Sequence, residues 1–147
     1  MNTMISIAKK HVLAMGLAIF CLNSALAALP IQHWTQASGA QVWLVESPAI
    51  PMVDVQIDFD AGGRRDPAAQ AGLAAVTAGM LSKGVAARGG APALDENQLG
   101  EAWADLGASF GAGASGDRMS FSLRSLTEPD LLDRAAALAA RQIASPL

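Results

Sequence analysis

Two stretches of the chain alternate strictly between apolar and polar residues, the pattern of a β-strand with one buried and one solvated face. The first covers residues 52–60, where Val53, Val55, Ile57 and Phe59 alternate with Asp54, Gln56, Asp58 and Asp60. The second covers residues 118–126 and carries Met119, Phe121 and Leu123. Two further strands are predicted, a β-branched and aromatic one at residues 41–45 and a glycine-rich one within residues 108–116.

Helical spacing predicts three helices between these strands. Residues 68–83 are good helix formers closed by Gly84, and Leu73, Val76, Met80 and Leu81 are expected to be buried. Asp95 is expected to cap a second helix, in which Trp103 is a core residue. Thr127 is expected to cap a third helix that carries Pro129 in its first turn. This order predicts an α+β fold, with an antiparallel-rich sheet and helices packed on one face.

The first 27 residues have the organisation of a secretory signal. Lys9 and Lys10 precede the apolar run 12–22, and Ala25-Leu26-Ala27 provides the small residues that signal peptidase accepts. The alternative, a retained membrane anchor, is disfavoured because the run is shorter than the roughly 20 residues that span a bilayer. We therefore expect cleavage after Ala27, export to the periplasm with no stable membrane anchor, and a mature domain over residues 28–147.

Composition and charge exclude several classes of function. Of the 147 residues, 52% are hydrophobic and 16% are charged, which is typical of a globular chain, and a net charge of −3 without basic clusters disfavours nucleic acid as a partner. The single cysteine, Cys21, lies in the predicted signal, and His33 is the only histidine after it. A thiolate site is therefore excluded from the mature chain. A serine hydrolase built on Ser120 or Ser122 would depend on His33 as its base, and the acidic face of residues 52–60 is more typical of a solvated strand than of a cation site.

Three segments resemble the pitrilysin/insulinase/mitochondrial processing peptidase family of zinc metallopeptidases. The first is Ala61-Gly62-Gly63-Arg64-Arg65-Asp66-Pro67. The second lies within residues 71–84 and matches at Ala71-Gly72-Leu73-Ala74 and again at Met80-Leu81-Ser82-Lys83-Gly84. The third is the block Leu106 to Ala112 with the strand that follows. With the opening at residues 34–45, the resemblance extends over nearly the whole mature chain. It implies that residues 28–147 are the N-terminal part of a peptidase domain that is incomplete at its C-terminus.

The resemblance also implies that the catalytic motif is degenerate. Active members carry His-x-x-Glu-His on a helix, where the histidines bind zinc and the glutamate acts on the bound water. Ala75 and Gly79 stand at the histidine positions and Ala78 at the glutamate position. The family's third ligand would fall beyond Leu147. No metal or cofactor site is therefore expected in this chain, and zinc is expected only in an active partner.

Three functional hypotheses follow. The first is a non-catalytic subunit that pairs with an active insulinase-like zinc peptidase to process a peptide substrate. The second is a truncated gene product without stable function. The third is an active zinc metallopeptidase whose ligands have moved to other positions.

Overall fold

The computed structural model describes residues 29–147, so the predicted cleavage site at Ala27 lies outside the described residues. The chain divides into two compact units, Met1–Ala49 and Ile50–Leu147. The described part of the first unit is an antiparallel hairpin of β1 (Ile31–Thr35) and β2 (Gln41–Val45). His33 stacks on its cross-strand partner Trp43 with ring centroids 4.8 Å apart.

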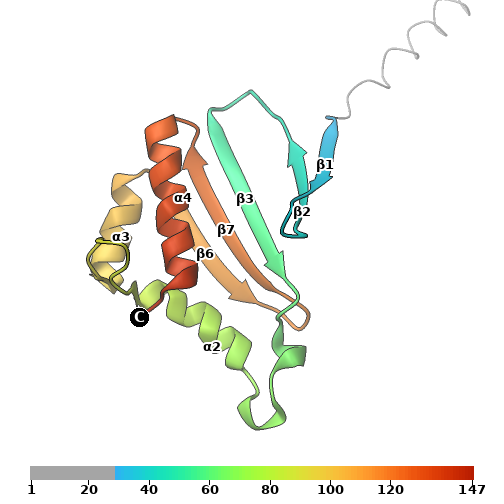
Figure 1. Ribbon diagram of the computed structural model, residues 1–147, viewed down its shortest axis with the longest axis vertical. Coiled ribbons are helices and arrows are strands. Elements are labelled where there is room, and N and C mark those ends of the chain that lie inside the picture. The colour runs from blue at the N-terminus through green and yellow to red at the C-terminus, as the bar shows by residue number, and fades with distance from the viewer. Residues whose placement is uncertain (1–28) are drawn as a thin grey trace, which may run out of the picture. The chain divides into compact units, whose positions relative to one another are not determined.

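The second unit contains a three-stranded antiparallel sheet (Figure 1). Its strands are β3 (Met52–Phe59), β6 (Ser109–Ala114) and β7 (Met119–Leu126), in the order β3-β7-β6. Its helices are α2 (Leu73–Met80), α3 (Glu96–Asp105) and α4 (Pro129–Ala144). A two-stranded sheet of β4 (Gly84–Val85) and β5 (Leu94–Asp95) lies between α2 and α3 in the chain. The predicted α+β class with an antiparallel sheet is confirmed.

The predicted N-cap of α3 is confirmed, whereas the predicted N-cap of α4 is wrong. Asp95 accepts a hydrogen bond from the backbone N–H of Gln98, whose side chain bonds back to the Asp95 N–H, so the predicted cap of α3 is part of a complete capping box. Thr127 was the wrong cap for α4. That helix begins at Pro129, a residue favoured at the first helical position, and the residue before it is Glu128, which makes no side-chain capping bond.

The hydrophobic core lies between α3, α4 and the sheet. It consists of Val85, Leu99, Trp103, Leu106, Ala135 and Ala139, all buried. Trp103 is only 8% exposed and stacks on Phe110 of β6 with ring centroids 5.8 Å apart, which confirms it as a core residue. Phe110 in turn stacks on Phe121 of β7. The aromatic residues therefore join α3 to the two strands beneath it.

Gln142 of α4 is a buried polar residue within this core. Its side-chain oxygen accepts a 2.9 Å hydrogen bond from the Trp103 indole N–H, and its amide nitrogen donates to the Leu81 carbonyl over 2.8 Å. Gln142 is 4% exposed, and both ends of its amide are satisfied. The amide thus links α4 to α3 and to the one-turn 3₁₀ segment Leu81–Lys83 that follows α2.

Strand β3 departs from the burial that its pattern predicts. Val55, Ile57 and Phe59 are between 37% and 49% exposed, because β3 is an edge strand of its sheet and, within the described residues 29–147, α2, α3 and α4 do not pack closely against it. The acidic residues on its other face are not simply solvated. Asp54 accepts two hydrogen bonds from Arg124 directly across the ladder, and these bonds lower the pKa of its carboxyl. The strand is thus held to β7 by cross-strand charge pairs as well as by backbone bonds.

Replacing Gln142 by leucine leaves the Trp103 indole N–H and the Leu81 carbonyl buried without partners. An unsatisfied buried group costs about 1–3 kcal/mol, so Gln142→Leu is expected to lower the free energy of unfolding by at least that amount. Urea unfolding monitored by Trp fluorescence measures the change. Gln70→Leu, at an exposed position, is the matched control and is expected to unfold like the unchanged protein. Equal midpoints for both variants would show that the amide contributes nothing.

Candidate functional site

Helix α2, which carries the three motif positions Ala75, Ala78 and Gly79 named in the sequence analysis, follows a glycine and is capped by a residue further upstream. Gly72 stands at the N-cap with φ +95°, a left-handed conformation that favours glycine. The Asp66 carboxylate accepts hydrogen bonds from the backbone N–H groups of Gly72 (2.8 Å) and Ala74 (3.1 Å). No local capping pattern predicts this cap, because Asp66 lies seven residues before Leu73, the first residue of α2. The Asp-Pro dipeptide, which cannot continue a helix, was its only local signal.

The buried side of α2 is its small-residue side. Ala74 and Ala78 are buried, as is Leu81 in the turn that follows. Leu73, Val76 and Met80, which were predicted to be buried, are 45%, 62% and 46% exposed. The prediction of their burial is wrong because α2 packs closely against β6, and only small side chains fit at that contact. Leu81 alone of the four predicted residues is in the interior.

The three motif positions divide between the two sides of α2. Ala75 and Gly79 are one helical turn apart on the exposed side, and a methyl group added to Gly79 would meet no atom within 4 Å. Ala78 is 6% exposed, so a carboxylate at that position would have to displace its neighbours. The arrangement retains the geometry of a two-histidine site while its side chains offer neither lone pairs nor a proton acceptor.

A shallow hollow of about 410 Å³ lies beside Ala75. It is bounded by the start of α2, by the turn at Gly63 and Asp66, and by the end of β6 at Ala114 and Ser115. The carboxylate of Asp66 is already engaged with the N-terminus of α2. The lining is therefore made mainly of small side chains and backbone.

The other candidate residues do not assemble into a site. Within residues 29–147 no three His, Cys, Asp or Glu side chains are grouped so as to hold a metal ion. The His33 ring lies 2.9 Å from the Gln41 side-chain oxygen on the hairpin. Ser120 donates a 2.6 Å hydrogen bond to Asp58, so its hydroxyl is paired with a carboxylate rather than with an imidazole base.

The turn that precedes α2 is docked on the turn between β6 and β7. The backbone N–H groups of Gly63 and Arg64 donate to the carbonyls of Ser115 and Gly116, each over 2.9 Å. A methyl group on Gly62 would come within 2.6 Å of backbone atoms of residues 116–118, a distance no real contact tolerates. These contacts position the start of α2 against the sheet without using any motif side chain.

Two arginines of the same turn bracket an acidic residue at the end of β3. The side chains of Arg65 and Arg64 both donate to the Asp60 carboxylate, and these hydrogen bonds lower the pKa of Asp60 to about 2. All three side chains are more than half exposed, so the pairs are screened by water and orient the turn more than they stabilise it.

No family model matches the chain, and no curated protein matches it. Among solved structures it is similar to the M16 peptidase inactive domain from Pseudomonas fluorescens, with 37% identity and a TM-score of 0.71 over 80% of this chain and 27% of that chain. A protease from Helicobacter pylori (17% identity, TM-score 0.61, 82% of this chain and 27% of that one) shares the fold. So does the periplasmic protease PqqL from Escherichia coli (21% identity, TM-score 0.66, 81% of this chain and 13% of that one).

These similarities define the class of the protein: an α+β domain of the metallopeptidase type. The chain belongs to the M16, or insulinase-like, peptidase family, which confirms the resemblance seen in its motifs. It spans about a quarter of the length of the P. fluorescens chain that it matches. Among residues 29–147, no helix has the length and hydrophobicity needed to cross a membrane.

Replacing each of two adjacent glycines in the turn before α2 by alanine is expected to affect stability differently. Gly62→Ala is expected to lower stability by more than about 1 kcal/mol, because the added methyl group collides with backbone that cannot move aside cheaply. Gly63→Ala is the matched control, since its methyl group would meet its nearest atom at 3.7 Å, an ordinary contact. Thermal unfolding followed by circular dichroism compares the two. Similar melting temperatures for both variants would contradict the close approach at Gly62.

The motif geometry is tested by restoring its histidines. The Ala75→His, Gly79→His double variant is expected to bind one zinc ion per chain, because the two rings project from one exposed side of α2. Binding is expected to be weaker than in a complete three-ligand site. Isothermal titration with zinc is the measurement, and the unchanged protein and Ala75→His alone are the controls, from which we expect no stoichiometric binding. A double variant that binds no better than the single one would show that the two positions do not form a ligand pair.

Proposed function

We propose that this chain is a non-catalytic subunit of an M16-type zinc peptidase, exported to the periplasm, that pairs with an active family member. The proposal rests on which features α2 keeps and which functional groups it lacks. The helix keeps its cap, its small-residue packing and the relative placement of Ala75 and Gly79, yet all three functional groups of the motif are replaced by hydrogen or methyl. In this reading the active partner alone provides zinc and the catalytic glutamate.

The exposed side of α2 supports a binding role. Leu73, Val76 and Met80 form an apolar surface on the helix that active relatives use for chemistry. Exposed apolar groups gathered on one element are typical of a surface that another protein covers. The solved relative from P. fluorescens is itself described as an inactive domain, and the E. coli relative is a periplasmic protease, which agrees with export and with a role in proteolysis.

The adjacent sheet edge supports peptide as the substrate. β6 is an edge strand of its sheet, and its Ala114 end borders the hollow beside Ala75. An edge strand offers unpaired backbone groups to which an extended peptide can add as a further strand. The subunit would thus hold a peptide segment that its active partner cleaves.

Co-expression with an active M16 peptidase, followed by affinity capture and a peptidase assay, tests this function. We expect a stable complex whose cleavage of peptides exceeds that of the active subunit alone. The Val76→Asp, Met80→Asp double variant is expected to weaken the complex at least tenfold, because it places two charges in the apolar contact. Ala104→Asp, at an exposed position of α3, is the matched control and should leave the complex intact. No complex and no change in cleavage with the unchanged chain would refute the proposal.

A further inference from the structure

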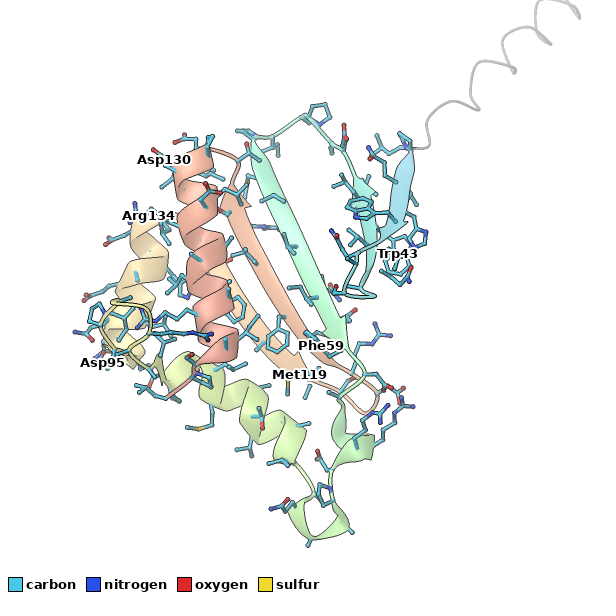
Figure 2. The ribbon with its side chains drawn as sticks, viewed as in Figure 1. Trp43, Phe59, Asp95, Met119, Asp130 and Arg134 are labelled. Carbon is cyan, nitrogen blue, oxygen red and sulfur yellow. The ribbon has the colours of Figure 1, made fainter. Side chains whose placement is uncertain are left out.

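Three methionines lie within the described residues, and they differ in exposure. Met80, the last residue of α2, is 46% exposed, and Met52, the first residue of β3, is 39% exposed. Met119 is half-buried, because it stands between Phe59 of β3 and Ala114 of β6 in the sheet. Figure 2 shows Met119 beside Phe59 at one end of the sheet. Since the oxidation of a thioether depends on its access to solvent, Met80 and Met52 are the more reactive sites.

Met80 belongs to an exposed apolar row on α2. Its other members, Leu73 and Val76, are 45% and 62% exposed. At 3.6 residues per turn the three side chains lie within about 60° of one another around the helix axis. The buried residues Ala74 and Ala78 lie on the opposite side, where α2 packs against β6. Met80 is therefore on the solvent side of the helix.

The backbone around Met80 is held in place by its neighbours. Leu81 is 4% exposed, and its carbonyl accepts the 2.8 Å hydrogen bond from Gln142. The Ser82 hydroxyl donates to the Gly79 carbonyl over 3.1 Å across the same turn. Neither contact uses the Met80 side chain. A chemical change to that side chain therefore alters the surface of α2 and leaves the fold intact.

We infer that Met80 is a modification site at which peroxide converts an apolar part of the α2 surface into a polar one. The Met80 sulfur attacks one oxygen of hydrogen peroxide, so that an S–O bond forms and the O–O bond breaks. Sulfur gives up two electrons to the peroxide, and the hydroxide that leaves takes up the remaining proton to become water. The product is a sulfoxide, which methionine sulfoxide reductases convert back to the thioether.

The modification regulates the proposed pairing, and this consequence alone rests on the proposed function. A sulfoxide oxygen within an apolar contact has to give up its hydrogen bonds to water, which costs free energy. The oxidised chain is therefore expected to bind an active subunit at least about threefold more weakly than the reduced chain.

The test is treatment of the full chain with dilute hydrogen peroxide, followed by peptide mapping with mass spectrometry. Trypsin places Met80 and Met119 in separate peptides, because it cleaves after Arg65, Lys83, Arg118 and Arg124. We expect the sulfoxide to form at Met80 at least about fivefold faster than at Met119, because Met80 is the more exposed of the two. The circular dichroism spectrum is expected to stay unchanged.

Hydrophobic-interaction chromatography measures the change in the surface. Met52→Leu is the background, because it removes the other exposed methionine. Peroxide is expected to shorten the retention of this variant, and treatment with a methionine sulfoxide reductase is expected to restore it. The Met52→Leu, Met80→Leu double variant is the matched control and should keep its retention. Leucine at position 80 is a good helix former that peroxide does not oxidise.

Three results would overturn the inference. One is equal rates of oxidation at Met80 and Met119. Another is an equal loss of retention by the single and the double variant. The third is loss of the helical signal on oxidation of Met80, which would show that its side chain supports the fold. All three are measured on the chain alone. The absence of a complex between the reduced chain and an active subunit, in contrast, would refute only the proposed function.

Discussion

The Gln142 side chain is the interaction on which the arrangement of the helices depends. Its one amide receives a hydrogen bond from Trp103 of α3 and donates one to the carbonyl of Leu81 at the end of α2. Buried polar groups are tolerated only when fully paired, so the three helices must keep the relative positions that satisfy this amide. The bond to Leu81 thus fixes the end of α2 relative to α3 and α4.

The start of α2 is held by the Asp66 carboxylate, by the close approach of Gly62 and by backbone bonds to the β6–β7 turn. None of these contacts involves the motif side chains. Ala75 and Gly79 lie on an exposed surface, so replacing larger residues there leaves no cavity in the core. The start of α2 is therefore positioned without the side chains at positions 75 and 79.

Exposed apolar side chains gather on two elements, α2 and β3. Leu73, Val76 and Met80 stand at helical spacing on α2. Val55, Ile57 and Phe59 alternate along β3, an edge strand of its sheet. The first set follows the period of a helix, and the second follows the period of a strand.

The sequence by itself determined which residues of β3 and of β7 share a face, the capped start of α3, and that the side chains at positions 75, 78 and 79 cannot bind zinc. The helix predicted over residues 68–83 is α-helical only at Leu73–Met80, and the strands β1, β4 and β5 were not predicted. Periodicity carries that information because side-chain direction follows from local backbone geometry. Which face is covered was decided by the tertiary structure. Leu73, Val76 and Met80 are exposed because α2 packs against the sheet through its small side chains. Val55, Ile57 and Phe59 are exposed because β3 is an edge strand. The cap from Asp66 and the buried amide of Gln142 also required the fold, since each joins residues that no local pattern brings together.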